Sequence, residues 1–182
     1  PNYDCHAQTS FAFIHPVRPH YNTLLKFDTA KYPAIKGDLA ESWNVAKDGL
    51  TYTFKLKKGV KFHDGSTFSS QDIKATYDRL RAPPAGVRSV RQASYADVAS
   101  IETPDPLTVV FKLKKQNASM LTNFASPWDC VYSAAKLKQD PKFPERNIMG
   151  TGPFTFVDHV AGSTWTGRKF DGYFEKGKPY LN

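Results

Sequence analysis

The chain has 182 residues, of which 40% are hydrophobic and 14% aromatic, and it carries a formal net charge of +8. This composition indicates a folded protein rather than a disordered one, and no stretch reaches the ~20 apolar residues of a membrane-spanning helix. Residues 1–4 have neither the basic start nor the apolar run of a signal peptide. We therefore expect a cytoplasmic protein, a mature secreted chain or a part of a longer one.

Two short elements are predicted in the first forty residues. Residues 9–14 predict a short strand, which ends at His15 and Pro16. Residues 21–27 carry Tyr21, Leu24, Leu25 and Phe27, a spacing that favours a short helix with both leucines in the core.

Residues 39–65 predict a β-meander with three tight turns. Asp48-Gly49 is a strong turn dipeptide, because both residues tolerate positive φ, and further Gly-containing turns follow at 58–59 and 64–65. Tyr52 and Phe54 alternate with polar residues, which places them on one face of a sheet. By pattern alone this is a plain meander of an α+β domain.

One helix and two further hairpins follow. Ser69 is a good N-cap, and Asp72 three residues later resembles a capping-box partner. Positions 73, 76, 77 and 80 then share one helix face, until the helix ends at two prolines. Hairpins are expected over 98–113 and 154–170, with short helices over 118–124 and 133–139.

The positive charge raises the alternative of a nucleic-acid-binding domain. The lysines, however, are scattered over separate hairpins, where they occupy or flank the polar positions of alternating strands. No zinc-finger, helix-turn-helix or RNP-type pattern accompanies them. Solvated sheet faces explain the charge better than a phosphate-binding track.

No catalytic or metal-binding pattern is present. The sequence lacks the motifs of hydrolases, metalloproteases and phosphate loops, and its histidines are isolated, so neither an enzyme nor a cofactor is predicted. Cys5 and Cys130 fit no zinc site. They could form one disulfide, but the sequence does not establish that their Cα atoms are close enough. Aromatic residues near breaks in the pattern suit either a ligand cleft or ordinary core packing.

Six stretches together carry a resemblance to a known family. They are 39–65 (with LAESW, DGLTYTF and GVKFHDG), 67–73 (TFSSQDI), 103–111 (TPDPLTVVF), 126–128 (SPW), 150–154 (GTGPF) and 172–180 (GYFEKGKPY). In this order they resemble the bacterial extracellular solute-binding proteins of family 5, the dipeptide, oligopeptide and nickel receptors of ABC importers. The resemblance covers nearly all of residues 21–182, and its specificity comes from the motifs occurring together.

The resemblance implies a mixed α/β fold of the type II periplasmic binding protein kind. Family members are much longer and close two lobes over a ligand, so the chain is expected to be an N-terminal fragment. Residues 39–149 would form a small β-rich inserted subdomain, domain II, and residues 1–38 and 150–182 would be parts of the ligand-binding domain I. The family also implies a precursor with a signal peptide, a periplasmic or extracellular location and a membrane permease as partner, without nucleic acid. That compartment permits a disulfide between Cys5 and Cys130.

The family's ligand-facing positions fall on six residues of this sequence: Thr9, Phe11, Phe13, Arg91, Tyr95 and Trp128. The expected function is capture of peptides or another small organic solute, without catalysis. A nickel ligand is disfavoured because the isolated histidines do not form a metal cluster. The alternatives are a basic nucleic-acid-binding domain and a structural module with no ligand of its own.

Overall fold

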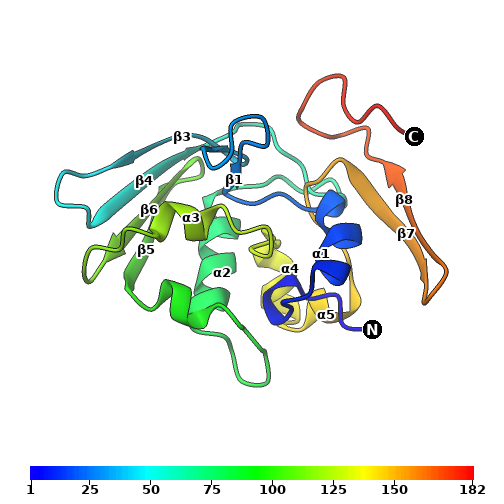
Figure 1. The fold of residues 1–182 in the computed structure, drawn as a ribbon, viewed down its shortest axis with the longest axis horizontal. Coiled ribbons are helices and arrows are strands. Elements are labelled where there is room, and N and C mark those ends of the chain that lie inside the picture. Colours follow the sequence, from blue (N-terminus) through cyan, green and yellow to red (C-terminus); the bar gives the residue numbers. More distant parts are fainter.

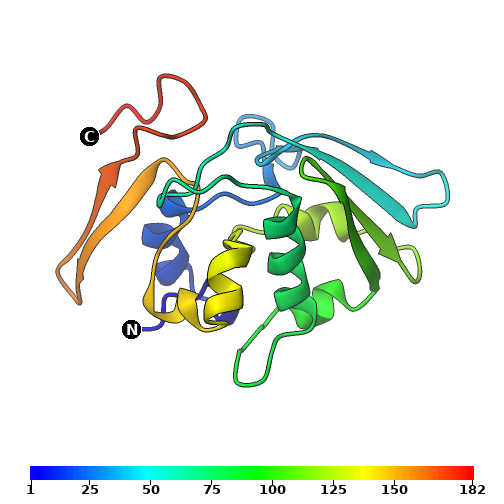
Figure 2. The same ribbon diagram turned by 180° about the vertical axis from the view of Figure 1, so that it is seen from behind.

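The computed structural model describes all of residues 1–182 and has a mixed α/β architecture. A four-stranded sheet is formed by β3, β4, β5 and β6. Figure 1 shows this sheet at one end of the molecule, the hairpin β7–β8 at the other, and the helices between them. Figure 2 shows α2 and α4 from behind, side by side between the two β structures. None of the helices combines the length and the hydropathy that crossing a bilayer requires.

The four-stranded sheet is antiparallel throughout, in the order β3-β4-β6-β5. Its strands are β3 (Ala40–Val45), β4 (Thr51–Leu56), β5 (Val98–Asp105) and β6 (Thr108–Leu113). The predicted turn between β3 and β4 is confirmed, with Gly49 at a φ of 69°. Tyr52 and Phe54 are buried on one face, as their alternation predicts. The predicted hairpin over 98–113 therefore joins the first two strands of the predicted meander in one sheet, because β4 pairs with β6.

Helix α2 (Ser70–Arg81) covers the buried face of this sheet. The capping box is present: the Ser69 side chain accepts from the start of the helix, and the Asp72 carboxylate accepts from the Ser69 backbone N–H at 2.8 Å. Tyr77 is fully buried and its ring packs against Phe111 of β6, with centroids 5.2 Å apart. The predicted helix and its buried face are confirmed.

The two elements predicted in the first forty residues are wrong. Residues 9–14 do not form a strand, because the helix α1 (Phe11–Val17) begins within them. Its buried residues, Ile14 and Val17, are three apart, which is the spacing of one helix face. Phe11 stays 65% exposed. The predicted helix over 21–27 is instead extended chain and the strand β1 (Leu25–Phe27), which pairs with β2 (Ile35–Gly37). A strand partner ten residues away is invisible to a periodicity argument, although both leucines are buried as expected.

The remaining elements are short. They are η1 (Cys5–Ala7), η2 (Arg18–His20), η3 (Gln92–Tyr95), α3 (Met120–Phe124), α4 (Ala134–Gln139), α5 (Phe143–Arg146), β7 (Phe154–Val160) and β8 (Thr164–Lys169). The predicted last hairpin is confirmed as β7–β8, whereas α5 has no counterpart among the predicted elements.

The hydrophobic core has two clusters. The larger one lies between the four-stranded sheet, α2 and α3, with Phe124 in contact with five other aromatic rings. The smaller one joins the N-terminal segment to α4 and to the chain after α3, and it contains Cys5 and Cys130. These cysteines form a disulfide, with Cα atoms 6.1 Å apart.

A buried polar network holds the N-terminal segment in place beside the disulfide. The Arg79 guanidinium donates to both carboxylate oxygens of Asp4, at 2.6 and 3.2 Å, and the Tyr132 hydroxyl donates to the same carboxylate at 3.0 Å. His6 Nε2 lies 3.0 Å from the Cys130 carbonyl oxygen, which can only accept, so Nε2 carries the proton. Nδ1 then accepts from Arg79 at 2.9 Å. The segment is thus fixed by covalent, ionic and hydrogen bonds.

Candidate functional site

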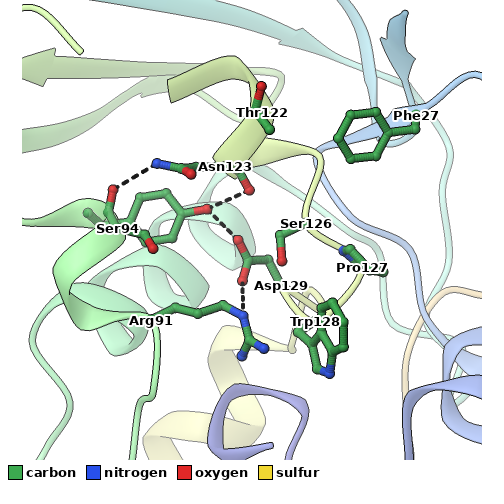
Figure 3. A pocket seen from close by; sticks show the side chains of 10 residues that line it. Phe27, Arg91, Ser94, Thr122, Asn123, Ser126, Pro127, Trp128 and Asp129 are labelled. Atoms are coloured by element: carbon green, nitrogen blue, oxygen red, sulfur yellow. Dashed lines mark hydrogen bonds and ion pairs between the residues drawn. The ribbon is translucent and has the colours of Figure 1, made fainter. Parts of the chain in front are cut away.

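The candidate site is a cavity of about 320 Å³ beside η3, α3 and the segment after α3. Its lining is Phe27, Arg91, Ser94, Tyr95, Thr122, Asn123, Ser126, Pro127, Trp128 and Asp129 (Figure 3). Three of the six predicted ligand residues, Arg91, Tyr95 and Trp128, are among them. Residues from separate parts of the sequence therefore meet at one cavity, as a binding site requires.

Arg91 lies at the start of η3 and is held by the N-terminal segment. Its Nη2 donates to the Gln8 carbonyl oxygen at 2.8 Å, and Nη1 donates to the Cys5 carbonyl oxygen at 3.4 Å. The guanidinium carbon is 4.9 Å from the centroid of the Trp128 ring, which makes a cation–π contact. A guanidinium has five N–H donors, so Arg91 keeps donors available after these backbone contacts.

Tyr95 closes the inner side of the cavity. The 3₁₀ turn of η3 directs its ring into the core, against Tyr77 of α2 at a centroid distance of 5.2 Å. Its hydroxyl lies 2.9 Å from the Asn123 carbonyl oxygen and also contacts the carboxylate of Asp129. Tyr95 is therefore a fixed wall of the cavity and a hydrogen-bond donor to its carboxylate.

Asp129 is a site residue that the sequence analysis missed. Its side chain is fully buried, and Oδ1 has no hydrogen-bond partner, since the nearest cation, Arg91 Nε, is 4.0 Å away. Burial raises the pKa of this carboxyl to about 7, against the opposing effects of the Tyr95 hydrogen bond and the charge of Arg91. A carboxylate next to Trp128 in an irregular segment was the only signal available in the sequence.

The other three predicted residues lie outside this lining. The exposed ring of Phe11 meets Trp128 edge to face, with centroids 5.0 Å apart, so it extends the aromatic surface beside the cavity. Phe13 is half-buried and packs against the smaller core cluster. Thr9 is exposed just before α1.

A second hollow, of about 510 Å³, lies near η2 and β1 and contains the buried Asp38. This carboxylate accepts from Arg18 at 3.2 Å, Lys26 at 2.9 Å, Asn22 at 3.0 Å and the Thr23 backbone at 2.9 Å. Its hydrogen-bonding capacity is used within the protein. The cavity at Asp129 is the better candidate because its buried carboxylate is not satisfied.

Comparison with known proteins identifies relatives along most of the chain. The family model described as bacterial extracellular solute-binding proteins, family 5 Middle, matches residues 34–182. The glutathione-binding protein GsiB of Escherichia coli O1:K1 / APEC is 35% identical over 156 residues, which are 86% of this chain and 30% of that protein. GsiB of Pectobacterium atrosepticum is 36% identical over 162 residues, which are 89% and 31% of the two chains.

Solved structures show the same fold. The binding protein AgaA from A. tumefacien R10, in complex with agropinic acid, superposes with a TM-score of 0.89 at 31% identity, over 100% of this chain and 36% of that one. The periplasmic binding protein DppA from Helicobacter pylori, in complex with the peptide STSA, gives 0.83 at 26% identity, over 96% and 38%. The predicted fold class is confirmed, and the chain spans about a third of the length of these relatives.

Proposed function

The chain belongs to the bacterial extracellular solute-binding proteins of family 5, and from that premise we propose that residues 1–182 supply one wall of a solute-binding cleft in the receptor of an ABC importer. The family consists of binding proteins rather than enzymes. The relatives bind solutes, so the comparisons favour a receptor over the alternatives of a nucleic-acid-binding domain and a structural module without a ligand.

The observation that carries the proposal is the cavity in which Arg91, Tyr95 and Trp128 meet. It combines a guanidinium with free donors, an aromatic ring and a buried carboxylate within one concave surface. Ligand pockets have this composition: apolar walls with a few placed polar groups that fix orientation. A cavity of about 320 Å³ suits part of a small organic solute, and the other lobe of the receptor would enclose the remainder.

The relatives indicate which solutes to test. GsiB is named for glutathione, and the two solved structures hold agropinic acid and a short peptide. All three ligands are small organic molecules with polar groups. We propose a peptide or another small organic solute of this kind as the ligand. Thr9, Phe11 and Phe13 would contact the solute from the α1 side, outside the cavity lining, with Phe11 next to Trp128.

We also propose the division of the chain into an inserted subdomain, 39–149, and two flanking parts of a ligand-binding domain, 1–38 and 150–182. The two hydrophobic core clusters support this division in outline, because most residues of the larger cluster fall within 39–131. The smaller cluster joins residues near the N-terminus to Leu137 and Ile148, so α4 and the segment after α5 pack with the flanking parts.

The compartment and the partner follow from the proposed function. A receptor of this family would work outside the cytoplasmic membrane, in the periplasm or at the cell surface, and would deliver its solute to a membrane permease. The disulfide between Cys5 and Cys130 is compatible with that oxidising compartment.

The test is calorimetric titration of the complete gene product with glutathione, agropinic acid and the dipeptide Met-Leu. We expect saturable binding of at least one of them, and we expect Arg91→Ala to weaken it by about tenfold or more, since a charged hydrogen-bonding group is lost. Arg88→Ala is the matched control, because Arg88 is exposed in the same loop and its replacement by alanine removes the same charge. Equal affinity of the two variants, or no binding of any probe, contradicts the proposal.

A further inference from the structure

Residues 150–154, the return segment, lead the chain from the proposed inserted subdomain into β7. On one side the segment touches the backbone of residues 19–21: a Cβ added at Gly152 would lie 2.5 Å from the Pro19 carbonyl oxygen. On the other side it meets His63, whose backbone N–H donates to the Gly150 carbonyl oxygen at 2.9 Å. The return segment is therefore held between two parts of the chain that are far apart in sequence.

The ring of His63 makes two hydrogen bonds to the return segment, and both require the neutral imidazole. Nε2 lies 2.9 Å from the Gly152 carbonyl oxygen, which can only accept, so Nε2 carries the proton. Nδ1 accepts from the Gly150 backbone N–H, with 3.4 Å between the two nitrogens. A second proton on the ring would occupy Nδ1 and would place two N–H groups against each other.

The ring of His20 holds the end of the return segment in the same way. Nδ1 lies 2.7 Å from the Phe154 carbonyl oxygen and therefore donates to it. Nε2 accepts from the indole N–H of Trp165 in β8 at 2.9 Å, and an indole nitrogen can only donate. Protonation of Nε2 would break this bond, which joins η2 to the hairpin β7–β8.

The surroundings of the two rings do not favour a positive charge. All their hydrogen-bond partners are neutral, namely backbone groups and one indole. Two charges act on His63: Asp64, which favours protonation, and His20, which opposes it. Asp64 is itself paired with Lys136 at 3.7 Å, and the nearest rings are aromatic. The other charged or titratable residues of η2, β7, β8 and the chain after β8 are Arg18, Asp158, His159, Arg168, Lys169, Asp171 and Tyr173.

Burial lowers the pKa of His63 to about 4, against the opposing effect of the bond to the Gly152 carbonyl, and burial also lowers the pKa of His20. An imidazole that has been released into water has a pKa of about 6.5. Between about pH 6.5 and 4 the open state therefore binds a proton that the closed state does not bind. Acidification through this interval favours opening, by up to about tenfold per pH unit.

We propose that His20 and His63 form a pH-sensitive latch, which holds the return segment while both rings are neutral and releases it when they are protonated. The latch joins the proposed inserted subdomain, which contains His63, to the flanking part that contains His20 and the hairpin β7–β8. Its opening loosens this connection in acid and leaves the four-stranded sheet folded, because neither histidine belongs to the core cluster of the sheet. The latch involves no ligand, so it is tested on the ligand-free protein.

Hydrogen exchange of the complete gene product, followed by NMR, reports on each half of the latch. The Gly150 amide is bonded to His63, and the Trp165 indole N–H is bonded to His20. Protection factors are corrected for the intrinsic exchange rate at each pH. From pH 7 to pH 5 we expect that of Gly150 to fall about twentyfold, as pKa values of about 4 and 6.5 require, and that of Trp165 to fall as well. Both should stay below the protection factors of the β4 amides, since the opening is local.

Two variants remove the titrating groups and keep neutral hydrogen-bonding side chains. In His63→Gln the change at Gly150 between pH 7 and pH 5 should be about twentyfold smaller than in the wild type. His20→Gln should have the corresponding effect at Trp165. His15→Gln, at an exposed histidine of α1, is the matched control and should keep the wild-type behaviour at both positions.

Three results would overturn the latch. One is a Gly150 protection factor that is the same at pH 7 and pH 5 in the wild type. Another is a wild-type pH dependence in His63→Gln, because a different group would then control the opening. The third is protection of Gly150 equal to that of the β4 amides, which would mean that the return segment opens only when the whole protein unfolds. If a variant does not fold, the first and third measurements on the wild type decide.

Discussion

Asp129→Asn should stabilise the protein at neutral and alkaline pH relative to the wild type. Burial raises the pKa of the Asp129 carboxyl to about 7, from an ordinary value of 3.8 for aspartate. Each pKa unit corresponds to about 1.4 kcal/mol, so a difference of about three units makes ionisation of the folded protein unfavourable by about 4 kcal/mol. Asparagine has the same shape, is neutral at every pH and can still accept from the Tyr95 hydroxyl.

The sign follows from proton counting. Between pH 4 and 7 the unfolded carboxyl has lost its proton, whereas the folded Asp129 still holds it. The folded state then binds more protons, so the free energy of unfolding falls as the pH rises through this interval. Above pH 7 the full cost is present in the wild type and absent in Asp129→Asn.

The assay is urea denaturation of the ligand-free complete gene product at several pH values between 4 and 8. The difference in unfolding free energy between Asp129→Asn and the wild type removes the contributions of all other titrating groups. It should shift in favour of the variant by about 4 kcal/mol over this range, while Asp158→Asn, an exposed control, should show no such shift. A difference that is independent of pH would refute the reasoning, because it would mean that Asp129 titrates as in the unfolded chain.

Three further predictions concern the frame around the site. Burial, and then the adjacent Arg79 guanidinium, lower the pKa of His6 to about 4. Acidification from pH 6.5 to 4 should therefore lower the free energy of unfolding by about 3 kcal/mol. In urea denaturation, His6→Gln should lack this part of the pH dependence. Replacing Cys5 and Cys130 by Ser opens a link across 125 residues and should lower that free energy by about 5 kcal/mol; equal denaturation midpoints would contradict this. In Gly152→Ala the new Cβ would lie 2.5 Å from the His20 carbonyl carbon, so we expect a loss of about 1–3 kcal/mol and a lower Tm by calorimetry.

The unsatisfied carboxylate illustrates a conflict between stability and function. An apolar or neutral side chain at position 129 would remove the cost of burying a charge. Functional sites retain groups that cost stability, and the protein is then less stable than it could be.

Local sequence patterns predicted the regular elements well where the decisive contacts are close in the chain. The turn at Asp48-Gly49 and the capping box of Ser69 and Asp72 are determined by neighbouring residues, and both are confirmed. The predictions for 9–14 and 21–27 are wrong because those segments are short. Their conformation depends on which side chains find the core and on a strand partner.

The sequence by itself determined the family, through motifs spread over residues 39–180, and with it the fold class that the comparisons confirm. It also indicated three residues, Arg91, Tyr95 and Trp128, that line one cavity. Tertiary structure alone decided that Asp129 belongs with them and that one of its oxygens stays unpaired. The physical reason is that burial and hydrogen-bond satisfaction arise from contacts between segments far apart in the chain, here η1, η3 and the turn after α3, and no local pattern encodes such distances.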